Sequence, residues 1–166
     1  MVKVLIINAV IKGYHEFKIK PPIGMSLKVT KEYGNKYDEH ACLVWIPELE
    51  TIPRHLWDIV TDAKRNETIQ TIAGLPIGRV PRGLSSCFWK LLESDDIECI
   101  KCEQTDVPCQ SFPPWPQPMG SGGGAVIPCN YHVQVKQGCD ASGVLSKIND
   151  AILNMPERNV LQVKIV

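Results

Sequence analysis

The stretch Asn35-Lys-Tyr37-Asp38 combines an amide, an aromatic ring and a carboxylate within four residues. These side chains can hydrogen-bond to a polar ligand and stack against it. They also suit a turn, because Asn and Asp side chains accept hydrogen bonds from nearby backbone N–H groups, with Tyr37 packed over the turn. The stretch is therefore a candidate binding site with a structural alternative, and the two roles are compatible.

Two arginines, Arg79 and Arg82, follow later in the chain and flank Val80-Pro81. Basic side chains gathered on one rim are typical of contact with nucleic-acid phosphates, but arginines near a turn are often solvated or paired with carboxylates. The chain has 18 basic and 18 acidic residues and a formal net charge of zero. Binding of a long duplex usually requires a basic excess, so any contact with nucleic acid should be local and short.

The seven cysteines suggest a different chemistry. Zinc-ligand spacing occurs in two pairs, Cys99-x-x-Cys102 and Cys129-x-x-His132, with Cys109 as a spare thiolate. The first pair lies in an apolar, β-branched run that predicts a strand, where residues three apart point to opposite faces. Buried free cysteines are common and behave as small apolar residues. We therefore expect no bound zinc, with the metal site as the open alternative.

Catalysis and membrane insertion find little support in the sequence. No cysteine or serine is spaced to pair with a histidine base, and the glycine-rich stretch 120–124 lacks the Lys-Ser/Thr of a phosphate-binding loop. No apolar run approaches the roughly 18 residues that a transmembrane helix needs. An odd number of cysteines without a secretory signal favours reduced thiols, in the cytosol or nucleus. We expect a non-enzymatic intracellular protein without a cofactor.

Hydrophobic periodicity predicts the elements that must position these residues. Apolar or alternating runs predict strands at 2–10, 26–31, 38–46, 77–80, 97–102, 126–135 and 162–166. Helical spacing predicts helices at 83–92 and 141–153 and a possible one at 54–60. Many short strands with few helices suggest a mainly β (α+β) domain, an OB-like small barrel with peripheral helices. We expect one domain over residues 1–166, with an elongated insertion at 47–74 and a Pro/Gly-rich loop at 111–124.

With their flanks, the two polar blocks read Glu32-Tyr-Gly-Asn-Lys-Tyr-Asp-Glu-His-Ala-Cys-Leu-Val44 and Ile77-Gly-Arg-Val-Pro-Arg82. This pattern resembles the signature of the HIRAN domain, E-x-x-N-x-Y-D-x-x-A-x-x-V followed by I-G-x-(V/L)-P-(R/K). The resemblance spans about Val4 to Asn154. It implies an OB-like module without catalytic activity, which in this family can hold the 3′ end of single-stranded DNA and stack bases on aromatic rings.

Carried over by position, the resemblance implies that Asp38 meets the terminal 3′-hydroxyl and that Tyr37 lies beside it. A carboxylate accepts from a free hydroxyl and repels an internal phosphate, so it can select ends. Arg79 and Arg82 fall where the family contacts the nucleic-acid backbone. The family's Arg-Tyr-Tyr in the first loop is replaced by His15-Glu16-Phe17. In this loop Phe17 could still stack and His15 could donate when protonated, whereas Glu16 would oppose a phosphate.

We therefore predict a binding module for single-stranded DNA ends, as a monomer in a nuclear protein concerned with DNA repair. The expected DNA-binding residues are Tyr37, Asp38, Asn35, Phe17, His15, Arg79 and Arg82. The alternative is a protein–protein interaction module that keeps the HIRAN-like fold without binding DNA. Net neutrality and Glu16 favour this alternative, and the intact Asn-x-Tyr-Asp block and the two arginines favour DNA.

Overall fold

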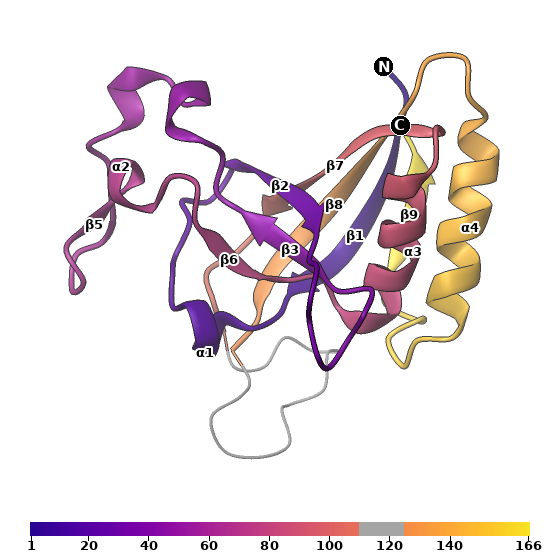
Figure 1. Ribbon diagram of the computed structural model, residues 1–166, viewed down its shortest axis with the longest axis horizontal. Coiled ribbons are helices and arrows are strands. Elements are labelled where there is room, and N and C mark those ends of the chain that lie inside the picture. The colour runs from indigo at the N-terminus through magenta and orange to yellow at the C-terminus, as the bar shows by residue number, and fades with distance from the viewer. Residues whose placement is uncertain (110–124) are drawn as a thin grey trace.

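The computed structural model describes residues 1–109 and 125–166 (Figure 1). The strands are β1 (Lys3–Ile11), β2 (Ser26–Lys31), β3 (Cys42–Trp45), β4 (Val60–Asp62), β5 (Glu67–Thr68), β6 (Pro76–Arg79), β7 (Ile97–Gln104), β8 (Ile127–Val135) and β9 (Gln162–Ile165). The helices are α1 (Tyr14–Phe17), α2 (Ile69–Ile72), α3 (Arg82–Glu93) and α4 (Ala141–Leu153), with 3₁₀ turns at Leu49–Thr51 and Arg54–Leu56. The predicted loop at 111–124 lies outside the described residues. No helix in the described part of the chain is long and apolar enough to cross a membrane.

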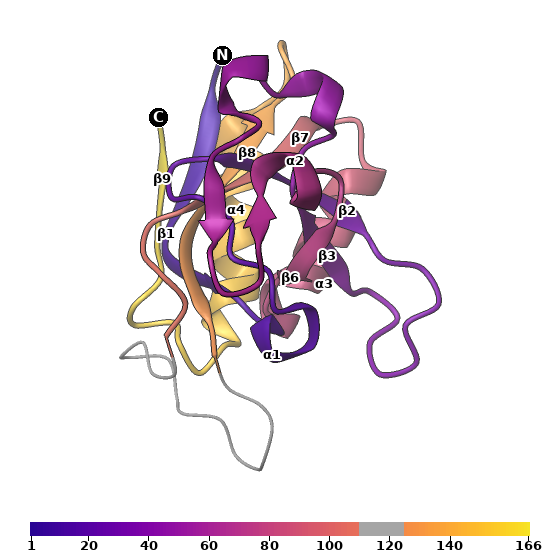
Figure 2. The same ribbon diagram turned by 90° about the vertical axis from the view of Figure 1, so that its left-hand side faces the viewer.

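Seven strands form one antiparallel sheet in the order β6-β3-β2-β7-β8-β1-β9. The sheet curves so that its β6 edge returns to the end of β1 (Figure 2). There Lys12 and Arg79 form a bridge in which each backbone N–H donates to the other's carbonyl at 2.8 Å. The mainly β fold of OB type is confirmed. The described strands meet at this bridge and are not hydrogen-bonded along their whole length into a closed barrel.

A glycine makes the close approach of β6 to β1 possible. A Cβ built on Gly78 would lie 2.4 Å from the Lys12 carbonyl oxygen and 2.5 Å from Cγ2 of Ile11. Real Cβ atoms do not approach other heavy atoms this closely, so any other residue would push the two strands apart. The glycine of the Ile77-Gly78 pair is therefore required by packing at the point where the sheet returns on itself.

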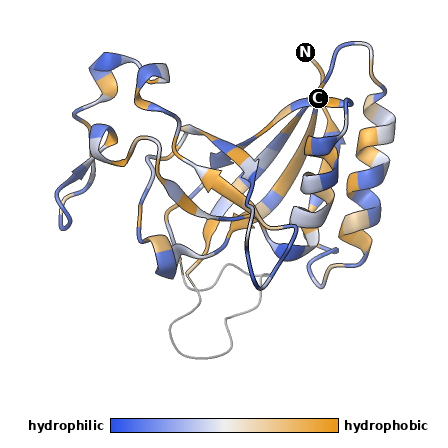
Figure 3. Ribbon diagram, in the orientation of Figure 1, coloured by the Kyte–Doolittle hydropathy of each residue, from blue (hydrophilic) through white to orange (hydrophobic). Residues whose placement is uncertain are grey.

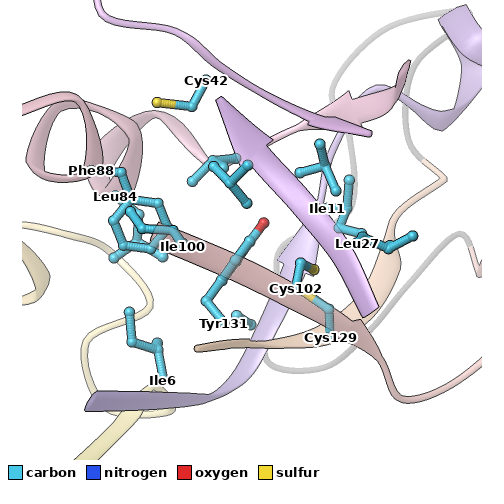
Figure 4. Packing of buried hydrophobic residues seen from close by; sticks show 14 of the residues in the cluster. Ile6, Ile11, Leu27, Cys42, Leu84, Phe88, Ile100, Cys102, Cys129 and Tyr131 are labelled. Atoms are coloured by element: carbon cyan, nitrogen blue, oxygen red, sulfur yellow. The ribbon is translucent and has the colours of Figure 1, made fainter. Parts of the chain in front are cut away.

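The core lies inside the curve of the sheet, and α3 closes one end of it (Figure 4). Leu84, Phe88 and Leu91 lie on one face of α3 and are buried, as the helical spacing predicts. The Phe88 ring meets the Tyr131 ring edge to face, with centroids 5.3 Å apart. The buried Tyr131 hydroxyl donates to the carbonyl of Val10 at 2.8 Å, which satisfies a polar group that would be costly to bury alone.

Helix α4 packs beside α3 at the same end of the sheet (Figure 1). Its start is fixed by Asp140, whose Oδ1 accepts from the backbone N–H of Ser142 at 3.0 Å. Val144, Ile148 and Ile152 recur every four residues and are buried. Hydrophobic and hydrophilic residues alternate along these helices and along the central strands (Figure 3). The predicted helix at 141–153 is confirmed.

Segment 47–74, which the sequence predicts to be an insertion, projects from the end of the sheet opposite α4 (Figure 1). The prediction of a helix at 54–60 is wrong. The segment contains one 3₁₀ turn, Arg54–Leu56. The carbonyl oxygens of Trp57 and Ile59 accept from backbone N–H groups at the start of α2, each at 3.0 Å. Within the segment, the carbonyls of Arg54 and Leu56 accept from N–H groups three residues further on, at 3.1 and 3.2 Å, instead of four, and the chain continues directly into β4.

Candidate functional site

The turn between β2 and β3 is built by the polar side chains that the sequence singled out. Asn35 Oδ1 accepts from the backbone N–H groups of Tyr37 and Asp38 at 2.8 and 3.0 Å. Asp38 Oδ1 accepts from the N–H of His40 at 3.0 Å. The Ala41 N–H donates to the Asp38 carbonyl at 3.2 Å, which is why β3 begins at Cys42 instead of residue 38. The predicted Asx-type turn is present. Tyr37 is 88% exposed, so its ring does not pack over the turn.

Arg79 is held by two carboxylates. Its Nε and Nη2 donate to the two oxygens of Glu32 at 2.9 and 3.0 Å, and its Nη1 donates to Glu16. Its guanidinium also lies over the Phe17 ring, 5.2 Å from the centroid. The hydrogen bonds from Arg79 hold the pKa of Glu32 below its ordinary value against the opposing effect of burial, and those to Glu32 raise the pKa of Arg79. Arg79 thus joins α1, the end of β2 and β6.

Asp38 lies against the first turn of α3. The Ser85 hydroxyl donates to Asp38 Oδ2 at 3.3 Å, and Arg82 Nε lies 3.9 Å from the same oxygen. A carboxylate near a helix N-terminus is stabilised by the helix dipole and by the unpaired N–H groups there. Arg82 also donates from Nη2 to the Tyr37 carbonyl, yet its side chain remains 76% exposed. Arg82 is therefore open to a ligand in a way that Arg79 is not.

These segments enclose a hollow of about 360 Å³, which we call the Asp38 hollow. Its walls are Lys12, Glu16, Asn35, Tyr37, Asp38, Ala41, Arg79, Val80 and Arg82. Five of the seven predicted site residues come together there: Asn35, Tyr37, Asp38, Arg79 and Arg82. Phe17 lies under Arg79, and His15 is exposed on α1 and is not part of the wall.

Sequence reasoning gave no role to two groups at this site, Lys12 and Glu32. Lys12 is brought to the hollow by its bridge with Arg79, a pairing of residues far apart in the chain. Glu32 had a signal, since it opens the motif three residues before Asn35, and Asn35 Nδ2 donates to its Oε1 at 2.6 Å. The motif glutamate therefore ties the turn to the motif arginine.

The charge of the site is balanced. Three basic side chains meet three carboxylates there, if Glu32 behind Arg79 is included with the wall. Larger hollows lie elsewhere in the described residues: one of about 650 Å³ between β2 and segment 47–74, one of about 590 Å³ between α3 and α4, and one of about 540 Å³ beside α1 and the end of β7. The Asp38 hollow is distinguished by the convergence of polar groups from several segments, which is typical of sites that orient a ligand.

The cysteines with zinc-ligand spacing do not converge. Cys102 and Cys129 are buried side by side in the core (Figure 4). Cys99 lies on the outer face of β7, where its thiol contacts Gln134 Oε1 at 3.3 Å. His132 alternates with buried residues of β8 and also lies on the outer side, and partial burial lowers its pKa. These four side chains are divided between two faces of the sheet, so they cannot bind one ion together.

No protein-family model matches the sequence, and no curated protein sequence matches it either. Among solved structures, the fold is similar to that of the HIRAN domain of human HLTF, with a TM-score of 0.53. The similarity covers 90% of this chain and 92% of that chain, at 11% sequence identity. The HIRAN-like fold that the motif predicts is confirmed. At this identity the similarity concerns the fold, and the roles of individual residues rest on the geometry of the site.

Proposed function

We propose that this protein is a non-catalytic nucleic-acid-binding module that takes the 3′ end of single-stranded DNA into the Asp38 hollow. The observation that carries the proposal is the convergence of the motif residues. Tyr37 and Asp38 from the turn, Arg79 from β6 and Arg82 from α3 line one hollow in a fold like that of a HIRAN domain. The hollow holds an exposed ring, a partly exposed carboxylate and an exposed guanidinium, the groups needed for a base, a hydroxyl and a phosphate.

In this proposal Asp38 accepts the terminal 3′-hydroxyl. Its Oδ1 already accepts from the His40 N–H, and its Oδ2 accepts from the Ser85 hydroxyl. Each carboxylate oxygen has two lone pairs, so a further donor can be accommodated while the turn stays intact. A phosphate at the same place would face a carboxylate, so an internal position of the strand is disfavoured. The exposed Tyr37 ring stacks the terminal base, for about 1–3 kcal/mol.

The two arginines take different roles in the proposal. Arg82 contacts the backbone, because its guanidinium is largely exposed beside the hollow. Arg79 keeps its carboxylate partners and positions the turn, because a phosphate would have to displace Glu16 and Glu32 to reach it. The proposal differs here from the sequence prediction, which gave both arginines the same role.

The direct experiment is a fluorescence polarisation titration of a labelled octathymidylate at low salt. The wild-type protein should bind, and Arg82→Ala should weaken binding and lower the slope of log K against log salt by about one. Lys64→Ala is the matched control, because it removes an exposed positive charge on the β4–β5 hairpin, away from the hollow. Absence of binding at low salt, or equal losses in both variants, would overturn the proposal.

A second candidate is a protein-interaction module with the same fold. It is favoured by the charge balance of the hollow and by the position of Glu16, half of whose side chain is exposed beside Arg79. In that case the oligonucleotide fails to bind while the fold is intact. We further propose an intracellular, nuclear role in DNA repair as a monomeric single domain, to be tested by imaging of the tagged protein and by sedimentation.

A further inference from the structure

A second group of side chains, three of them with rings, gathers where the turn after β2 meets α3. We call it the Tyr33 cluster, and it consists of Lys31, Tyr33, His40 and Trp89. The Tyr33 and Trp89 ring centroids are 5.3 Å apart with their planes at 72°, and the His40 ring lies 5.3 Å from Trp89 at 47°. Lys31 Nζ lies 5.4 Å from the Trp89 centroid and 6.0 Å from that of Tyr33. None of these residues lines the Asp38 hollow.

The rings of the Tyr33 cluster differ in exposure. Trp89 and His40 are half-buried, and the Lys31 side chain is only 21% exposed, so these three form a fixed support. Tyr33 is 76% exposed although it is held edge to face on Trp89. A large ring held in place yet left in water offers a preorganised surface for another planar group, because little further conformational freedom is lost on binding.

Helix α3 connects the two sites. Arg82 and Trp89 are seven residues apart, which is close to two helical turns, so both lie on the same face of α3. The Ser85 hydroxyl, which donates to Asp38, lies between them on that face. The rise along the helix from Arg82 to Trp89 is about 10 Å. Stacked nucleotides repeat every 3.4 Å along a strand, so this separation corresponds to roughly three nucleotides.

We infer that the Tyr33 cluster is a second binding site for the same single strand, in which Tyr33 stacks a base a few nucleotides away from the 3′ end. This inference rests on the proposed function. Lys31 lies at the same surface and supplies the positive charge that the strand's phosphates require, and its present partner is the exposed carboxylate of Glu93 at 3.9 Å. At 3.9 Å, with the carboxylate side exposed to water, this ion pair is weak, so Glu93 can give way to a phosphate while Lys31 stays in place.

The inference predicts that affinity depends on strand length through Tyr33. A thymidine dinucleotide with a free 3′-hydroxyl fills the Asp38 hollow and does not reach the Tyr33 cluster, whereas an octanucleotide reaches both. Tyr33→Ala should weaken binding of the octanucleotide by about 5- to 150-fold, the range for loss of one stacked base. It should leave the dinucleotide affinity within about twofold. Tyr33→Phe keeps the ring and should bind both lengths as the wild type does.

The outcomes separate this inference from the proposed function. If Tyr33→Ala, folded by circular dichroism, binds both lengths as tightly as the wild type, the Tyr33 cluster is a structural contact and the inference is wrong. If the wild type binds the octanucleotide without distinguishing its ends, and Tyr33→Ala abolishes that binding, the cluster binds DNA and the end-sensing role of Asp38 is wrong. If the wild type binds neither length, both proposals fail.

Discussion

Replacement of Arg79 tests whether this arginine positions the turn or contacts the ligand. Arg79→Met keeps much of the apolar stem and removes two hydrogen bonds to Glu32 and the contact with Glu16. The side chains of Arg79 and Glu32 are 28% and 16% exposed, so their pairing is screened less than a surface pair. Hydrogen bonds to charged groups contribute about 1.5–3 kcal/mol when buried, and partial exposure reduces this.

We expect Arg79→Met to lower the free energy of unfolding by about 2 kcal/mol, which corresponds to a fall in Tm of about 4–8 °C for a domain of this size. Urea unfolding of Arg79→Met, Glu32→Gln and the double variant forms a cycle. The coupling between the two residues should be about 1–2 kcal/mol, because each single change leaves a partner without its opposite charge. Oligonucleotide affinity, measured where every variant is folded, should fall less than in Arg82→Ala.

The reasoning is refuted by the opposite pattern. An unchanged Tm together with a loss of DNA affinity larger than that of Arg82→Ala would mean that Arg79 contacts the ligand directly and that its carboxylate partners are displaced on binding. A coupling near zero would mean that the contacts with Glu32 contribute nothing to stability.

Three further predictions follow from single contacts. The pKa of Glu32 is lowered from the ordinary value of 4.5, so its contribution to stability is present above that pH and is lost as the pH falls through the folded-state pKa. In Glu32→Gln, the free energy of unfolding should therefore fall less steeply with pH below about pH 4.5 than in the wild type. In thermal unfolding, Gly78→Ala should lower the stability by about 1–3 kcal/mol, because its Cβ would meet the Lys12 carbonyl. Gly143→Ala in α4 is the control: the nearest atom to its Cβ is 3.5 Å away, so it should raise the stability by up to about 1 kcal/mol. Because the zinc-spaced cysteines lie on two faces of the sheet, a chelator should leave the melting curve unchanged, and a fall in Tm with loss of one equivalent of zinc would contradict this.

The parts of the fold that sequence predicts well are those with a complete local signal. Alternation over six residues gives β2 with its observed ends, and a capping Asp140 followed by apolar residues every four positions gives α4. The helix predicted at 54–60 does not form, because residues 57–60 pair with residues 68–70 and the chain becomes the strand β4, which seven residues of helical spacing do not reveal. Local periodicity carries no information about such partners.

At the candidate site, too, contacts between neighbouring residues are predictable from the sequence, and contacts between distant residues are not. The motif places Asn35 and Asp38 in a turn, and their bonds to nearby N–H groups could be anticipated from residue type. The pairing of Arg79 with Glu16 and Glu32 joins residues 63 and 47 positions apart, which only the folded sheet brings together. The support of Tyr33 by Trp89 is missed for the same reason, since one lies after β2 and the other on α3.

The central claim is that Asp38 accepts the hydroxyl of a 3′ end in the hollow, and its most direct test compares two ends of one oligonucleotide. Polarisation titrations at low salt would use the same octathymidylate with a 3′-hydroxyl or a 3′-phosphate, for the wild type and for Asp38→Asn. Asparagine retains an oxygen that can accept from the His40 N–H but removes the negative charge. The wild type should bind the hydroxyl end at least about tenfold more tightly, and Asp38→Asn should lose that preference. Equal affinity of the wild type for both ends would contradict the claim.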